Sequence, residues 1–195
     1  MGADSADAVT RKPLFVAKRR FGPSAGESWG RYVAWSGLTQ LHEVVSLDTM
    51  LCPTVPQELI AADWEHNVHA DYQTSYFRSL EYLRARVADE PELNILAVLE
   101  QPSADEVERS APLGFGFLGF DVLDVHGDVS ALTNCGGFDD VFARAELSPL
   151  GLLTDLTRAN EIRHGLRAAY PSEPHAECHV WAIWRDETSS ESPPG

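Results

Sequence analysis

Residues 113–138, LGFGFLGFDVLDVHGDVSALTNCGGF, constrain the fold more than any other stretch of this chain. Alternate residues of 115–124 form two faces that are both largely apolar, which predicts a strand inside a sheet that is covered on both sides. Gly127 can adopt the positive φ that a short hairpin turn requires. The stretch therefore predicts a hairpin in which residues 129–133 form the second strand.

Cys135 follows this hairpin and precedes two glycines, so it lies at a predicted corner of the chain. Such a corner can expose a nucleophile, and the glycine N–H groups could bind an anion. A cysteine nucleophile also needs a base, for which His126, His175 and His179 all qualify. We take His126 as the candidate base and include Asp121, a carboxylate on an otherwise apolar strand, in the candidate catalytic set. The alternative is that Cys135 is a small, inert core residue.

A further set of potential ligands is the sequence His175-x-x-Cys178-His179. The apolar residues that follow it predict a strand, and neighbouring residues of a strand point to opposite faces. Cys178 and His179 would then be unable to bind the same ion. We therefore expect neither a metal site nor a cofactor.

The other elements follow from apolar periodicity and from breaks at proline. Helices are predicted at 56–66, 71–88 and 152–170. Extended segments are expected at 13–21, 31–35, 95–99 and 178–185. Residues 38–51 fit a helix by the spacing of their leucines and a strand by alternation, and we favour the helix.

The charge of the chain is strongly acidic and unevenly distributed. The formal net charge is −15, from 15 basic and 30 acidic residues. Five basic and two acidic residues lie in the first 20 positions, so the remainder has 10 basic and 28 acidic residues. Such a body repels nucleic acids and anionic membranes and attracts a basic protein partner. Solubility alone is the alternative explanation for this charge.

The chain has three cysteines and no CxxC motif, which does not suit a disulfide framework. We therefore expect a reducing cytoplasm. The basic N-terminal segment is not followed by the apolar region of a signal peptide. No apolar run approaches the ~18 residues that a membrane span needs.

Together these patterns predict an α+β fold with a mainly antiparallel sheet of about four strands and helices packed over it. Residues 13–186 are expected to form one domain, between a flexible leader at 1–12 and a disordered tail at 187–195. The expected core includes Leu80, Leu83, Phe117, Phe120, Leu156, Leu166 and Ile183.

For function we favour an acidic cytoplasmic protein that binds a protein partner, as inhibitors and immunity proteins do, because no complete catalytic set is visible. The alternative is a small cysteine-dependent enzyme with Cys135 as the nucleophile.

Overall fold

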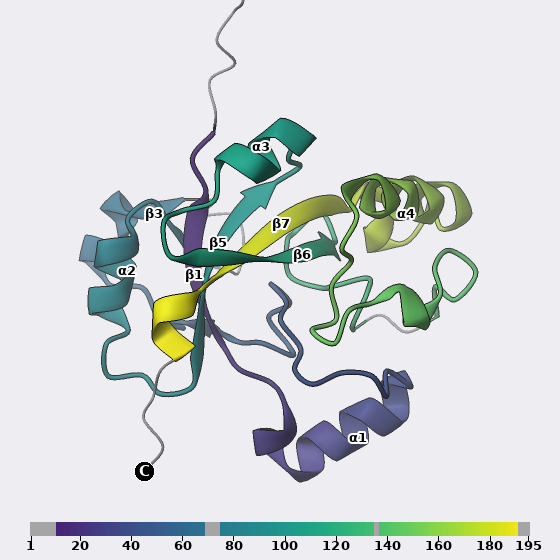
Figure 1. The fold of residues 1–195 in the computed structure, drawn as a ribbon, viewed down its shortest axis with the longest axis horizontal. Helices are drawn as coiled ribbons and strands as arrows, with labels where there is room; N and C mark the ends of the chain where they lie inside the picture. The colour runs from purple at the N-terminus through teal and green to yellow at the C-terminus, as the bar shows by residue number, and fades with distance from the viewer. Residues whose placement is uncertain (1–10, 69–74, 135–136, 191–195) are drawn as a thin grey trace, which may run out of the picture.

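The structure is a computed structural model that describes residues 11–68, 75–134 and 137–190 (Figure 1). The helices are α1 (Glu27–Ser36), α2 (Leu80–Arg86), α3 (Ala104–Arg109) and α4 (Leu156–Ala169). Short 3-10 helices are η1 (Pro23–Ala25), η2 (Ala61–Glu65), η3 (Arg144–Glu146), η4 (Pro174–Glu177) and η5 (Glu187–Ser190). The strands are β1 (Leu14–Arg19), β2 (Thr54–Val55), β3 (Asn67–Val68), β4 (Tyr76–Phe77), β5 (Leu93–Glu100), β6 (Phe115–Leu123) and β7 (His179–Asp186). The prediction of an α+β fold is confirmed.

These strands form one antiparallel sheet in the order β3-β4-β1-β5-β7-β6, and β2 pairs with β1 outside this path. The predicted antiparallel sheet is confirmed, but it has seven strands in the described residues instead of about four. The four longer strands match the predicted extended segments. The other three are two residues long, so they are too short to produce an alternating pattern in the sequence.

Alternate residues of the central strands belong to two hydrophobic clusters, one on each face of the sheet. The first cluster includes Ala97 of β5 and Ala182 of β7 together with Leu83 of α2 and Ile162 and Leu166 of α4. The second cluster includes Leu96, Val98, Trp181 and Ile183 of the same strands together with Val45, Leu47 and Leu152 from loops. The first cluster thus contains residues of helices and of loops such as Leu41 and Leu132, and the second joins the strands mainly to loop segments.

β6 lies at the edge of the sheet, whereas the sequence predicted an interior strand. It pairs with β7 on one side. On its other side, Phe120 and Leu153 exchange two backbone hydrogen bonds of 2.8 and 3.0 Å, and the Ala131 N–H donates to the Val122 carbonyl at 2.8 Å. Backbone groups of loops therefore pair with the outer edge of β6 in place of a second flanking strand. The apolar residues on both faces of β6 are covered by loops and neighbouring strands.

A β-bulge interrupts β6 between Phe117 and Gly119. Gly119 has a φ of 143°, and a Cβ atom there would lie 2.4 Å from the Leu153 carbonyl oxygen. The missing side chain thus allows the 150–153 loop to reach the strand edge. Phe117, which was predicted to be buried, is 42% exposed, whereas Phe120 is 3% exposed.

Residues 131–134 form a turn, so the prediction of a second hairpin strand at 129–133 is wrong. Only an isolated bridge joins Ser130 to Leu123. The N–H groups of Leu132 and Thr133 donate to Ser130 Oγ at 3.1 and 3.3 Å. The chain curls around this hydroxyl because local side-chain bonds compete with the sheet ladder.

Residues 38–51 are neither the helix nor the strand that their pattern allowed. The Val44 N–H donates to the Phe21 carbonyl at 2.8 Å, and the Val45 N–H donates to the Leu150 carbonyl at 2.9 Å. The backbone bonds of this segment go to distant parts of the chain, which local periodicity does not reveal.

The helix predictions had mixed outcomes. α4 confirms the helix expected at 152–170, and it begins only at Leu156 because the Asp155 carboxylate accepts the Arg158 N–H at 2.7 Å and caps it. α2 lies within the predicted 71–88 helix, but Tyr76–Phe77 form β4 instead, and residues 71–74 are outside the described residues. The 56–66 prediction is wrong, since only η2 forms there. α1 occupies the segment where 31–35 was expected to be extended.

Both ends of the described chain contact the domain. Arg11, in the expected leader, forms an ion pair with Glu106 at 2.7 Å. Glu187–Ser190, in the expected tail, forms η5, and the Thr188 N–H donates to Asp186 Oδ1 at 3.0 Å. Residues 1–10 and 191–195 lie outside the described residues.

Most of the other core predictions agree with the structure. Leu83, Phe120, Leu166 and Ile183 are buried, and Leu80 and Leu156 are half-buried.

The two phenylalanines of β6 provide a test of this core. We expect Phe120→Ala to lower the free energy of unfolding by about 3–5 kcal/mol, the usual loss for a buried phenylalanine. Phe117→Ala should lower it by less than about 2 kcal/mol, because its ring is partly in solvent. Urea denaturation of both variants measures the difference. An equal loss of unfolding free energy in the two variants would contradict the difference in burial between the two rings.

Candidate functional site

Asp121 is fully buried in β6 and accepts four hydrogen bonds. Its Oδ2 atom accepts from Ser46 Oγ at 2.5 Å and from the Leu47 N–H at 3.3 Å. Its Oδ1 atom accepts from Ser130 Oγ at 2.7 Å and from the Val122 N–H at 2.8 Å. Burial raises the pKa of Asp121, and the bonds from Ser46 and Ser130 oppose that shift. Protein groups therefore engage both oxygens of this carboxylate.

A second buried carboxylate, Asp48, is joined to Asp121 through Ser130. Asp48 Oδ2 accepts from the Ser130 N–H at 2.9 Å and from Asn134 Nδ2 at 2.8 Å. Asp48 Oδ1 accepts from the N–H groups of Met50 and Leu51, both at 2.8 Å. The two carboxylates thus bind the 46–51 loop to β6 and to the turn that follows it.

Lys18, on β1, supplies a buried cation close to these carboxylates. Its Nζ atom donates to the Leu47 carbonyl at 2.7 Å and to Thr54 Oγ1 at 3.0 Å. Burial lowers the pKa of Lys18 from 10.5 to about 8, while the charges of nearby residues, including Asp48, oppose that shift. Because Lys18, Asp48 and Asp121 are buried and bonded within the protein, we interpret this group, the Asp121 cluster, as structural.

Two of the three predicted catalytic residues, Asp121 and His126, lie in the described residues. His126 is exposed in the turn after β6, whereas Asp121 is buried and makes the bonds given above. His175 is buried and His179 is half-buried. Cys135 lies outside the described residues. A cysteine-dependent enzyme stays a prediction, and the described hydrogen bonds include none between Asp121 and His126.

The Asp121 cluster predicts a specific dependence of stability on pH. Between pH 8 and 10.5 the unfolded chain holds the Lys18 proton and the folded protein loses it, so the contribution of Lys18 to stability rises with pH. The unfolding free energy of the wild type relative to Lys18→Met should therefore increase across this range, by at most about 1.4 kcal/mol per pH unit. Urea denaturation at pH 7.5, 9 and 10 measures it.

Lys12→Met is the matched control, because Lys12 is exposed. It should show no comparable trend relative to the wild type. A difference between the wild type and Lys18→Met that does not change with pH would contradict the burial of a charged lysine.

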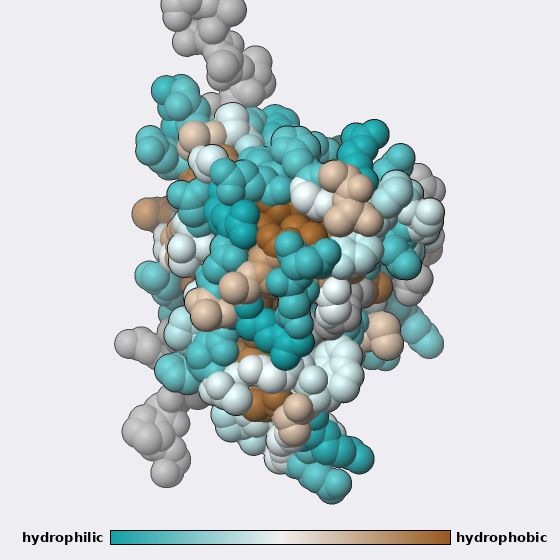
Figure 2. All heavy atoms as spheres, turned by 90° about the vertical axis from the view of Figure 1, so that its right-hand side faces the viewer, coloured by the Kyte–Doolittle hydropathy of each residue, from teal (hydrophilic) through white to brown (hydrophobic). Residues whose placement is uncertain are grey.

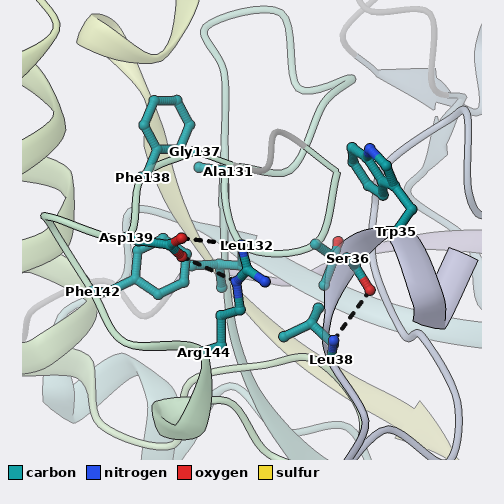
Figure 3. Close-up of a pocket in the computed structure, with 11 residues that line it drawn as sticks. Trp35, Ser36, Leu38, Ala131, Leu132, Gly137, Phe138, Asp139, Phe142 and Arg144 are labelled. Atoms are coloured by element: carbon teal, nitrogen blue, oxygen red, sulfur yellow. Dashed lines mark hydrogen bonds and ion pairs between the residues drawn. The ribbon is translucent and has the colours of Figure 1, made fainter.

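A cleft on the surface lies between the C-terminal end of α1 and the loop before α4 (Figure 3). Trp35 forms one side, and Phe138 and Phe142 lie opposite it. Leu38 and Leu132 also line the cleft. We call this surface the Trp35 cleft.

Trp35 is 60% exposed, although it belongs to a row of aromatic residues in which Tyr32 is buried and Phe21 is half-buried. Its ring centroid lies 6.2 Å from that of Tyr32, which in turn lies 5.3 Å from that of Phe21. The Tyr32 hydroxyl donates to the Thr133 carbonyl at 2.8 Å and so fixes α1 to the turn after β6. The tryptophan is therefore presented by an anchored helix.

Arg144 and Asp139 form the polar part of the Trp35 cleft. Arg144 Nε and Nη2 each donate to a different oxygen of Asp139 at 3.0 Å. A Cβ atom at Gly37, which has a φ of 69°, would lie 2.4 Å from Arg144 Nη1. Glycine at this position thus ends α1 and makes room for the guanidinium. Arg144 and Asp139 neutralise each other within the cleft. Most of the other side chains that line it are apolar.

Sequence reasoning missed the Trp35 cleft because it missed α1. The signal was present, since Trp29, Tyr32 and Trp35 are three residues apart and Gly37 follows them as a typical helix end. The residues on the opposite side of the cleft come from positions about 100 further along the chain, and no local pattern links them to α1.

Three further observations bear on function. No group of three or more His, Cys, Asp and Glu side chains in the described part of the chain is arranged to hold a metal ion. Among the helices of that part, none is both long and apolar enough to cross a membrane. No protein family matches this chain, and neither a characterised protein nor a solved structure is similar to it.

Proposed function

We propose that this protein binds a basic protein partner through the Trp35 cleft, as an inhibitor or immunity protein binds its target. The observation that carries the proposal is a tryptophan 60% exposed at the edge of an apolar cleft, in a chain of net charge −15. Tryptophan is enriched among the residues that dominate protein–protein binding energies.

The size of the Trp35 cleft favours a protein over a small molecule. Its cavity volume is about 20 Å³, whereas small-molecule sites are usually ~300–1,000 Å³. Such a space can hold only a small group, such as part of one side chain of a partner whose surface packs over Trp35. The ring itself would then be buried against the partner, which is how an aromatic anchor contributes affinity.

The net charge of −15 favours a basic partner. Figure 2 shows the side of the molecule that lies on the right in Figure 1, and most of this face is hydrophilic, with small hydrophobic areas between the polar residues. An acidic body attracts a basic protein over long distances and increases its association rate. The apolar cleft would supply the short-range contact.

The described cysteines are compatible with the cytoplasmic location that we propose. Cys52 and Cys178 are buried free thiols. Burial raises the pKa of Cys52 to about 12 and that of Cys178 to about 11. Both are thus inert core residues that need no oxidising compartment.

The binding surface can be tested with two matched tryptophan variants. Trp35 and Trp64 are 60% and 59% exposed, and Trp64 lies on η2, which precedes β3 at the far side of the molecule from α1 (Figure 1). The wild type, Trp35→Ala and Trp64→Ala would be immobilised and exposed to lysate of the source cells. We expect the wild type and Trp64→Ala to retain the same basic protein. With that protein purified, Trp35→Ala should weaken the Kd about tenfold or more.

Equal affinity of Trp35→Ala and the wild type would exclude the Trp35 cleft as the interface. Retention of an acidic protein would contradict the proposed chemistry of the partner. Thermal unfolding of each variant controls for loss of the fold.

The electrostatic part of the proposal predicts a salt dependence of the association rate. Raising ionic strength from about 0.05 to 0.5 M should slow association steeply, because salt screens the attraction between exposed charges, and should change dissociation much less. Stopped-flow measurement of tryptophan fluorescence with the purified partner gives both rates. An association rate that does not change with salt would show that attraction between charges does not speed the binding of the partner.

A further inference from the structure

A second pocket, of about 340 Å³, lies between α4, η4 and the start of β7. Arg163, His164 and Arg167 of α4 line it together with Gln101, Glu177 and His179. We call it the Arg163 pocket. Its volume is within the range of small-molecule sites, unlike that of the Trp35 cleft.

Neither arginine of this pocket forms an ion pair with a carboxylate, whereas most other arginines of the described residues do. Ion pairs with Asp or Glu are made by Arg11, Arg19, Arg31, Arg84, Arg86, Arg109, Arg144, Arg158 and Arg185. Neither Arg163 nor Arg167 makes one within the described residues. In a chain with twice as many acidic as basic residues, two neighbouring arginines without such pairs are an unusual concentration of positive charge.

Neutral groups hold Arg163 in position. Its Nη1 atom donates to Gln101 Oε1 at 3.0 Å, and its Nη2 atom lies 3.3 Å from His164 Nε2. The guanidinium is therefore oriented without being neutralised by a carboxylate. Arg167 follows four residues later on α4, so both side chains extend from the same face of the helix.

His179 adds a further polar group on the strand side of the pocket. Its Nδ1 atom lies 2.5 Å from Glu100 Oε1. A carboxylate at Nδ1 fixes the orientation of the ring and leaves Nε2 as the nitrogen that a ligand can contact. The Glu177 carboxylate, which also lines the pocket, carries one negative charge against the two guanidinium groups.

We infer that the Arg163 pocket binds the phosphate group of a small molecule. Two guanidinium groups offer several N–H donors, to which the two imidazoles add when protonated, and a phosphate offers several acceptor oxygens with more than one negative charge. A phosphate on a nucleic acid is disfavoured, because the chain as a whole has a net charge of −15. This site is separate from the Trp35 cleft and does not depend on the proposed protein partner.

Calorimetric titration with inorganic phosphate tests this inference. Ionic strength is held constant with sodium chloride, and acetate is titrated in parallel to distinguish phosphate from a simple carboxylate. We expect phosphate to bind and acetate to bind at least about tenfold more weakly, because it has fewer acceptor oxygens and less charge. Arg167→Gln should weaken phosphate binding about tenfold, the effect of losing one charge-assisted contact.

Arg78→Gln is the matched control, because Arg78 is an exposed arginine that lacks an ion pair with Asp or Glu among the described residues and does not line this pocket. It should leave phosphate affinity within about twofold of the wild type, since the same charge is lost away from the site. Should Arg167→Gln fail to fold, Arg163→Lys keeps the charge, loses the planar fork and should also weaken binding.

Three results would overturn the inference. These are the absence of phosphate binding by the wild type at constant ionic strength, equal affinity of Arg167→Gln and the wild type, and acetate binding as tight as that of phosphate.

Discussion

The buried carboxylate of Asp121 is the interaction on which the rest of this structure depends. A charged group with no access to water is stable only when hydrogen bonds replace its hydration. Here the replacements come from Ser46, Leu47, Ser130 and the adjacent Val122. Two separate loops must therefore meet at the edge strand, and Asp48 and Lys18 extend the same network to the 46–51 loop and to β1.

The same interaction reaches the proposed binding surface through a continuous series of contacts. Ser130 bonds to Asp121 and collects the N–H groups of Leu132 and Thr133, so it sets the path of the turn. The Thr133 carbonyl accepts the Tyr32 hydroxyl, which fixes α1 and the exposed Trp35. Loss of the Asp121 cluster would consequently be expected to displace the Trp35 cleft as well as to lower stability. The carboxylate that the sequence suggested for catalysis thus supports the proposed binding surface.

Charge distinguishes the two proposed sites. Most arginines are paired with carboxylates, so they contribute little positive potential of their own, and the acidic excess acts over the whole body. Arg163 and Arg167 are among the arginines of the described residues without such a pair, and Gln101 and His164 orient Arg163 without neutralising it. A basic protein and a small phosphate-bearing molecule would therefore be drawn to different places on one molecule, and each can be tested without the other.

The sequence by itself determined the elements whose pattern is long and local. Alternation and apolar runs located β1, β5, β6 and β7, and helical periodicity located α4. The acidic charge was also fixed by composition. Only the tertiary structure decided that β6 is an edge strand, that residues 129–133 form an isolated bridge and part of a turn instead of a strand, and that Trp35 faces Phe138 across a cleft. The reason is physical. An apolar strand has the same sequence pattern whether a strand or a loop pairs with its edge. The hydrogen-bond donors to a buried carboxylate are those that lie near it in space, and they come from distant parts of the chain.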